Sequence, residues 1–170
     1  NAALQIKKLK IINFRKFESY SIEFDRQLTV LVGDNGTGKS TLIDATCIAL
    51  GTLFQKIQNT EALGIVSDDS RGAVIKQGDM FDIQSQYPVS VEASGIVLGE
   101  EVGWLRSLKS AKGRTTQADA GRMIDAGKRL QELVGKGNEV VLPVLARYGT
   151  DRLWKQTASK DKATPNRTRG

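Results

Sequence analysis

One octapeptide in this chain has the residue types and the spacing of a phosphate-binding loop. Residues 33–40 read G-D-N-G-T-G-K-S, and a threonine follows them. Glycines let the backbone take positive φ angles, so that successive N–H groups turn inward around phosphate oxygens. Lys39 would reach the β- and γ-phosphates, and the Ser40 hydroxyl would ligate Mg²⁺. The predicted nucleotide-binding residues of the loop are Gly33, Asp34, Asn35, Gly36, Thr37, Gly38, Lys39, Ser40 and Thr41.

The segments on either side of this loop agree with that chemistry. Residues 27–32 have the apolar centre of a buried strand, and residues 42–50 place apolar side chains on most faces of a helix that Gly51 would end. A helix that begins at the loop adds the positive end of its dipole to the phosphate site. The alternative is an ordinary glycine-rich turn before a helix, and the strand–loop–helix order makes it the weaker interpretation.

Two more strands are expected before the loop. Residues 4–12 alternate between apolar and polar side chains, and residues 20–24 alternate again. Residues 13–17 break the first pattern as a turn. The two strands are therefore expected to form an antiparallel pair beside the strand that leads into the loop.

The middle of the chain gives weaker signals. Residues 52–70 have a helical tendency that ends in a turn or a helix cap at residues 67–70, and residues 73–75 are a short apolar run. Residues 87–98 and 102–105 read as two strands joined by a turn that contains Gly99. This arrangement predicts a β-hairpin.

The last third of the chain predicts a helix followed by a strand. A polar loop over residues 109–116 leads into an amphipathic helix over residues 117–134. Residues 139–145 read as a buried strand that Pro143 pushes toward a sheet edge or a bulge. The loop over residues 148–152 would then lie at the carboxyl end of a strand, which is where ligands bind in open α/β sheets.

The composition of the chain bounds the class of protein. A length of 170 residues with 39% hydrophobic residues fits one domain or a large fragment of one. No apolar run approaches the roughly 18 residues of a membrane span, and the start lacks the apolar region of a signal peptide. Cys47 has no second cysteine to pair with, which favours a core position and a cytoplasmic protein. The absence of histidine excludes His-based catalysis and His metal ligands.

The positive charge of the chain is concentrated at its end. Residues 152–170 carry six basic residues and one acid, a net charge of +5 out of +6 for the whole chain. Such a segment is either a nucleic-acid-binding face or, as we favour, a solvated tail. The expected organisation is an incomplete nucleotide-binding domain over residues 1–154 and a mobile or linking basic tail over residues 155–170.

The first 50 residues resemble a known group of ATPases. The runs LKIINFRKF (9–17), IEF (22–24) and VGDNGTGKSTLIDA (32–45) resemble, in order and spacing, the amino-terminal lobe of ABC-type ATPases of the SMC/RecF group. These proteins work in chromosome structure, recombination and DNA-break repair. The run LPVLARYGTDRLW (142–154) also looks like ATPases of bacterial defence and retron systems, such as the PtuA ATPase of Septu.

The resemblance implies a fold and roles for several residues. It implies an α/β P-loop NTPase, an ABC-type amino-terminal lobe with antiparallel strands beside a partly parallel sheet and helices. In that family the Asn-Phe-Arg element, here residues 13–15, sits beside the nucleotide. Arg15 would contact phosphate, Lys16 would be its neighbour, and Asn35 would lie near the γ-phosphate. The alternative for Arg15 and Lys16 is an exposed basic turn.

The sequence also departs from the family. It has no Ser-Gly-Gly signature and no switch histidine, and residues 96–101, the nearest match to a Walker B strand, lack the required aspartate. Gln156 is a candidate for the glutamine loop. No catalytic residue is therefore expected in this chain, which resembles the first lobe of a split ATPase.

Three functions follow from these observations. We favour an ATP- and Mg²⁺-binding lobe of an SMC-like ATPase in DNA repair, recombination or anti-phage defence, completed by a second lobe and a homodimer partner. The resemblance further implies DNA or an HNH-type nuclease subunit as partners, and no membrane. The alternatives are a self-sufficient small P-loop kinase or GTPase, for which no Asn-Lys-x-Asp motif is present, and a DNA-binding module that rests on the tail alone.

Overall fold

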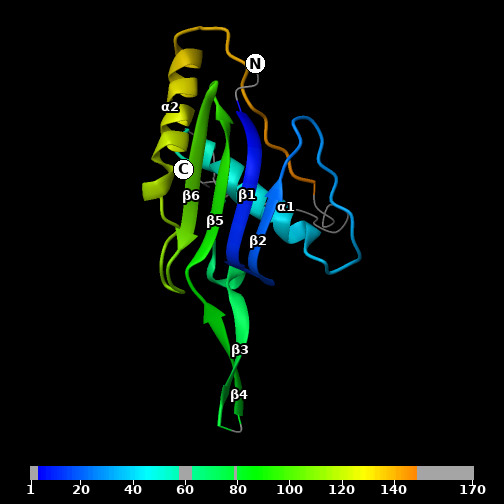
Figure 1. Ribbon diagram of the computed structural model, residues 1–170. Helices are drawn as coiled ribbons and strands as arrows, with labels where there is room; N and C mark the ends of the chain where they lie inside the picture. The colour runs from blue at the N-terminus through cyan, green and yellow to red at the C-terminus, as the bar shows by residue number, and fades with distance from the viewer. Residues whose placement is uncertain (1–3, 58–62, 79, 149–170) are drawn as a thin grey trace, which may run out of the picture.

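The computed structural model describes residues 4–57, 63–78 and 80–148. Strands β1 (Leu4–Phe14), β2 (Phe17–Glu23), β5 (Val89–Val97) and β6 (Glu100–Leu108) form an antiparallel sheet in the order β2-β1-β5-β6. Helix α1 (Lys39–Gly51) crosses one face of this sheet, and helix α2 (Gly121–Gly135) packs beside β6 (Figure 1). The chain is therefore a mixed α/β fold, as the sequence predicted.

Alternating side chains build the sheet side of the core. On β1, Leu9 and Ile11 are buried and lie opposite Ala93 and Val91 of β5. Successive side chains on a strand point to opposite faces, so Lys8 and Lys10 face solvent. Both predicted hairpins, β1–β2 and β5–β6, are confirmed, although β1 continues through Phe14.

Helix α1 closes the core from the other side. Leu42, Ala45, Ile48 and Ala49 are buried against the sheet. The buried Trp104 of β6 donates from Nε1 to the carbonyl oxygen of Ala49 at 3.0 Å, which ties β6 to the end of the helix. The apolar helix predicted over residues 42–50 is thus confirmed, with its first turn beginning at Lys39.

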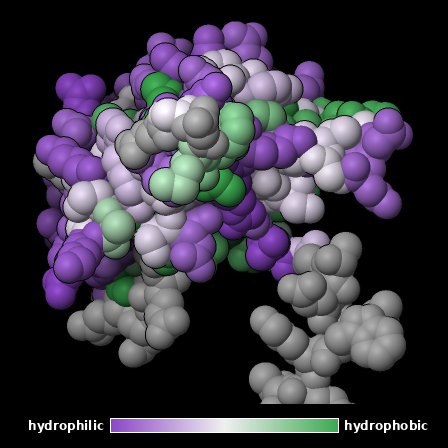
Figure 2. Space-filling model, turned by 90° about the horizontal axis from the view of Figure 1, so that it is seen from below, coloured by the Kyte–Doolittle hydropathy of each residue, from purple (hydrophilic) through white to green (hydrophobic). Residues whose placement is uncertain are grey.

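The segment between α1 and β5 holds elements that the sequence indicated only in part. Two short 3₁₀ helices, η1 (Thr52–Phe54) and η2 (Ser67–Asp69), match the helical tendency and the predicted turn. Strands β3 (Arg71–Gln77) and β4 (Met80–Gln86) form a separate two-stranded arm that projects from the body (Figure 1). Figure 2 looks at the molecule from that end and shows a mostly hydrophilic surface with small hydrophobic areas. Only the apolar run at residues 73–75 anticipated this arm.

The predicted loop over residues 109–116 and the helix after it are also found. The helix begins later than expected, because the 3₁₀ turn η3 (Ala118–Ala120) precedes α2. Its apolar stripe, which includes Met123, Ile124 and Leu130, is buried. None of the helices in the described part of the chain combines the length and the apolar character needed to cross a membrane.

Two strand predictions are wrong in this structure. Residues 27–32 and 139–145 lie outside any helix or strand, and Val32 and Val144 are each 91% exposed. A strand forms only when its N–H and C=O groups pair with a neighbour, and no other described segment supplies one. The antiparallel β1–β2 pair therefore lies beside β5 instead of the phosphate-loop segment. Every strand pair among the described residues is antiparallel, so they contain no parallel part of a sheet.

Candidate nucleotide-binding site

The phosphate-binding loop closes on itself at the amino-terminal end of α1. Gly36 and Gly38 have φ angles of 81° and 103°, which only glycine adopts readily. The Lys39 ammonium donates to the carbonyl oxygens of Gly33 at 2.6 Å and Asp34 at 2.7 Å. The Thr37 hydroxyl also donates to the Asp34 carbonyl, at 2.8 Å. The glycines thus stand where the sequence required unusual backbone angles, and the lysine lies inside the curve of the loop.

The turn between β1 and β2 lies directly on this loop. The Lys16 ammonium donates to the carbonyl oxygen of Gly36. The Phe17 ring packs against Gly38, and the Lys16 ammonium lies 5.4 Å from the centre of that ring. Lys16, which the family resemblance alone singled out, is therefore next to the loop in space although it precedes it by about 20 residues in sequence.

Arg15 is held by two carboxylates from different elements. Its Nη1 donates to Asp44 Oδ2 of α1 at 2.6 Å, and its Nε donates to Asp69 Oδ1 of η2 at 2.9 Å. Its backbone N–H donates to the Asp69 carbonyl oxygen at 2.6 Å. Burial alone would lower the pKa of the Arg15 guanidinium, but the hydrogen bonds to Asp44 and Asp69 outweigh it and raise that pKa. Arg15 is thus a permanent cation with a fixed orientation.

Sequence reasoning missed both of these aspartates. Asp44 follows Ser40 by four residues on α1, so the two side chains lie on one face of the helix. That spacing was a usable signal for Asp44. Asp69 lies 54 residues from Arg15, in a turn that the sequence marked only as polar, so nothing local pointed to it.

A second arginine reaches the same helix from the end of the described chain. Arg147 Nη2 lies 2.5 Å from Asp44 Oδ1 as an ion pair, although Oδ1 accepts no hydrogen bond within the described part. This pair brings the segment after residue 145 against the phosphate-loop helix. Of the loop predicted over residues 148–152, only Tyr148 is described. The glutamine-loop candidate Gln156 and the basic tail lie outside the described residues.

The remaining predicted residues separate into two groups. Asp34, Asn35, Thr37 and Ser40 are exposed on the loop and the first helical turn, where a nucleotide and Mg²⁺ can reach them, and Thr41 is buried beneath. Asn13 instead donates from its side chain to the Pro88 carbonyl oxygen at 3.1 Å, which ties β1 to the start of β5. No cluster of three or more potential metal ligands occurs among the described residues. The exposed Ser40 hydroxyl stays the predicted Mg²⁺ ligand of the loop.

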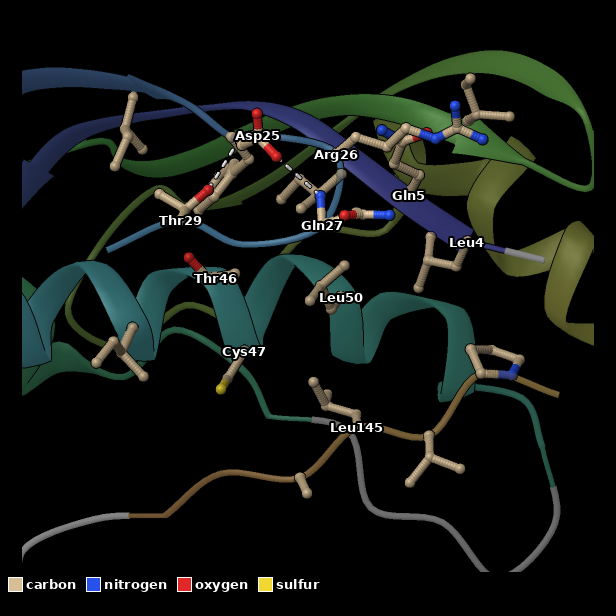
Figure 3. Close-up of a pocket in the computed structure, with 18 of the residues that line it drawn as sticks. Leu4, Gln5, Asp25, Arg26, Gln27, Thr29, Thr46, Cys47, Leu50 and Leu145 are labelled. Carbon is tan, nitrogen blue, oxygen red and sulfur yellow. Dashed lines mark hydrogen bonds between the residues drawn. The ribbon is translucent and has the colours of Figure 1, made fainter. Parts of the chain in front are cut away.

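A largely apolar groove runs along α1 from Leu42 to Leu50. It measures about 830 Å³ and is bounded by the start of β1, by residues 24–31, by α1 and by residues 143–146. Figure 3 shows Leu50, Cys47 and Leu145 beside it, with Asp25 and Thr29 bonded within the segment that covers it. No residue from 33 to 40 lines it. The groove therefore does not include the phosphate-binding loop.

Comparison with known proteins shows the family to which the chain belongs. A family model described as an AAA domain (AAA_23) matches residues 8–167. The chain belongs to this AAA domain family. Membership implies nucleotide binding, which agrees with the closed glycine loop and the exposed Ser40 of this AAA domain.

Individual relatives of the AAA domain are a chromosome partition protein, DNA replication and repair proteins, and DNA double-strand break repair ATPases. It is 28% identical over 107 residues to the chromosome partition protein Smc of Methanocaldococcus jannaschii. This alignment covers 62% of the chain and 9% of Smc. It is 51% identical over 43 residues to the DNA replication and repair protein RecF of Leptospira interrogans, 25% of the chain and 12% of RecF. It is 31% identical over 81 residues to the DNA double-strand break repair Rad50 ATPase of Pyrococcus abyssi, 48% of the chain and 9% of Rad50.

These matches span about a tenth of each relative's own length. A solved structure from work on ATP-driven dimerization and DNA-stimulated activation of SMC ATPases aligns with a TM-score of 0.47 and 21% identity, and covers 73% of this chain and 80% of that one. The SMC/RecF resemblance read from residues 4–50 is confirmed at the level of the family. The narrower resemblance to defence and retron ATPases stays a prediction.

Proposed function

We propose that this AAA domain is the ATP-binding amino-terminal lobe of an SMC-like ATPase. The observation that carries the proposal is the contact between the glycine loop and the β1–β2 turn, which brings Lys16 beside Lys39 at the start of α1. Two ammonium groups and the positive end of a helix dipole suit a polyphosphate. The protein would act in DNA repair, recombination or anti-phage defence.

The chain's own residues would bind and orient the nucleotide. Backbone N–H groups of the loop would surround the α- and β-phosphates, and Lys39 would exchange its bonds to the Gly33 and Asp34 carbonyls for phosphate oxygens. The Ser40 hydroxyl would ligate Mg²⁺, which neutralises charge on the β- and γ-phosphates when bound. Lys16 and Arg15 would close the site from the side of the β1–β2 turn.

Completion of the site would require a second lobe. Leu28, Val30 and Val32 are 72%, 69% and 91% exposed and alternate along a segment with strand character. The segment over residues 139–145 is similarly unpaired, and both border the apolar groove. Strands from a second lobe would pair with these segments and fill the groove. A homodimer partner, DNA and an HNH-type nuclease subunit are the further partners we propose on the family resemblance.

Titration calorimetry with Mg²⁺ and ATP tests the proposed function. We expect Lys39→Ala to weaken ATP binding by about 10- to 100-fold, since a charge-assisted hydrogen bond contributes about 1.5–3 kcal/mol. The control is Lys128→Ala on α2, where the lysine pairs with Asp125 away from the loop. Equal ATP affinity of the Lys39→Ala and unmodified chains would contradict the assignment. Tighter binding of GTP than of ATP would favour the small-GTPase alternative.

A further inference from the structure

The β3–β4 arm presents an apolar face to solvent. Residues opposite each other in an antiparallel pair share one face of the ribbon, so Val74 lies beside Ile83, and Lys76 lies beside Phe81. Val74, Phe81 and Ile83 are 67%, 71% and 73% exposed. The Lys76 ammonium lies 5.9 Å from the centre of the Phe81 ring. The rest of the described chain therefore leaves this face of the projecting arm uncovered (Figure 1).

The arm is also incomplete as a sheet. A two-stranded hairpin is marginally stable in water, and three or more strands with an apolar face are needed for independent stability. Among the described residues, β3 and β4 form a sheet only with each other, so each strand has one outer edge with unpaired N–H and C=O groups. An open edge beside an apolar face is what a further strand requires for binding.

The two outer edges of the arm are not equally open. The start of β3 is held against the body, because Ser70 forms a β-bridge with Phe14 and Arg71 Nη2 lies 3.1 Å from Glu18 Oε2 of β2 as an ion pair. Strand β3 also carries Lys76, and a lysine on an edge strand opposes pairing with another strand. Strand β4 contains no basic residue. The edge of β4 is therefore the better site for a further strand.

The charge of the arm indicates which kind of partner fits it. Residues 71–86 contain two basic and two acidic residues, a net charge of zero. A nucleic-acid partner would require an excess of positive charge to neutralise phosphates, so the arm is suited to a protein strand. Apart from Asp82, the side chains of β4 are apolar or neutral. A strand of the same composition meets it without repulsion, and β4 of a second copy is such a strand.

Strand β4 can pair with its own copy in one favourable register. In an antiparallel pair of identical strands related by a two-fold axis, one residue lies opposite its own copy. With Ile83 at that position, all of β4 is paired, and Asp82 lies opposite Gln84 of the second copy. Centring the pair on Asp82 would set two carboxylates directly opposite each other, which is destabilising. Centring it on Gln84 would leave Met80 and Phe81 unpaired.

We propose that the β4 edges of two copies pair antiparallel about Ile83, so that two arms form one four-stranded sheet in the order β3-β4-β4-β3. Its apolar face would carry Val74, Phe81 and Ile83 from both copies. The contact uses no residue of the phosphate-binding loop, so it goes beyond the proposed function and would form without nucleotide. An interface of this size belongs to the weak class, and the dimer should therefore form at micromolar to millimolar concentrations.

Sedimentation equilibrium of the 170-residue chain without nucleotide tests the arm contact. We expect the average mass to rise from 18.5 kDa toward twice that value as the protein concentration increases. Ile83→Lys sets two ammonium groups opposite each other and removes apolar area, so it should weaken the dimer by about 10- to 100-fold. The matched control is Val74→Lys on the same face. It should weaken the dimer less, because both β4 strands would separate the two copies of Val74.

A mixture of two charge variants tests the register. Ile83→Lys and Ile83→Glu should each be monomeric at a concentration where the unmodified chain is a dimer. An equimolar mixture of the two should dimerise, because opposite charges then meet at the axis. A mixture of Val74→Lys and Val74→Glu should show no gain over the separate variants. Thermal unfolding should give similar midpoints for all four variants, since both positions are exposed.

The outcomes separate this inference from the proposed function. An unmodified chain that stays monomeric at millimolar concentration, or a dimer that Ile83→Lys leaves intact, would overturn the arm contact. A dimer that forms only with ATP would overturn it as well. If the mixture of Ile83 variants stays monomeric, the register about Ile83 is wrong. Lys39→Ala should dimerise like the unmodified chain, so its ATP affinity reports on the proposed function alone.

Discussion

Phe17 packs on Gly38 so closely that a Cβ atom on the glycine would lie 2.5 Å from Cζ of the ring. Phe17 begins β2, and Gly38 immediately precedes α1. This contact joins the β1–β2 hairpin to the phosphate-binding loop, and it brings Arg15 and Lys16 to the nucleotide site. Any side chain at position 38 would push the two apart.

The contact predicts unequal effects at two glycines of the loop. Gly38→Ala combines a φ angle of 103° with the collision against Phe17, and it should lower the free energy of unfolding by about 2–4 kcal/mol. Gly36→Ala has a φ angle of 81° but no atom within 4 Å of its Cβ, so it should cost only about 1–2 kcal/mol. Urea unfolding measures both. Adding Phe17→Leu to Gly38→Ala should recover part of the loss, and a lack of recovery would argue against the collision.

The chain by itself is predicted to bind ATP without hydrolysing it at a measurable rate. Hydrolysis requires a group that orients water, a carboxylate that helps hold Mg²⁺ and donors that stabilise the γ-phosphoryl charge. The loop supplies Lys39 and Ser40, while the sequence contains neither a Ser-Gly-Gly signature nor a histidine. Loss of one arginine finger alone can cost about 10³–10⁵ in rate, and several groups are missing together.

Phosphate release by the isolated chain is the corresponding measurement. The control is Lys39→Ala, which should release phosphate at the same background rate as the unmodified chain. Turnover near ~1 s⁻¹ that this variant abolishes would mean that a complete catalytic site exists within these residues, and the self-sufficient P-loop reading would replace ours.

A third prediction concerns the contribution of the buried Arg106 to the stability of the fold. It is 2% exposed and donates to the Thr116 carbonyl oxygen at 3.0 Å and to the Thr52 hydroxyl at 3.2 Å. With the Gln55 amide turned so that its oxygen faces the guanidinium, Nη1 and Nη2 each donate to it at 2.8 Å. Burial lowers the pKa of Arg106, and none of these partners is a carboxylate. Three neutral acceptors from two segments, residues 52–55 and Thr116, thus bind the guanidinium.

Removing this side chain should therefore be costly. Arg106→Ala leaves a cavity and three unpaired acceptors, and it should lower the free energy of unfolding by about 2–4 kcal/mol. The exposed Arg114 is the matched control, and Arg114→Ala should stay within about 0.5 kcal/mol. Arg106→Lys keeps the charge but has no planar fork, so its free energy of unfolding should lie between those of Arg106→Ala and Arg114→Ala. An equal free energy of unfolding for all three variants would refute the structural role of Arg106.

Local patterns in the sequence determined much of the secondary structure and the phosphate-binding loop of this protein. The glycine loop, the start of α1, both hairpins of the main sheet and the amphipathic α2 follow from periodicity and turn residues within windows of about ten residues. The loop residues of the candidate site follow from one motif. The contact of Lys16 with the loop was anticipated only because residues 9–45 resemble a family in which that turn adjoins the nucleotide.

Only the tertiary structure decided which strands pair and which charges meet. Residues 27–32 have the composition of a buried strand, yet Leu28 and Val30 are exposed, because a strand needs a hydrogen-bonding neighbour that no local pattern can specify. The same holds for Arg15, whose partners Asp44 and Asp69 lie 29 and 54 residues away. Electrostatic contacts depend on distance in space, so the orientation of this arginine followed from the fold alone.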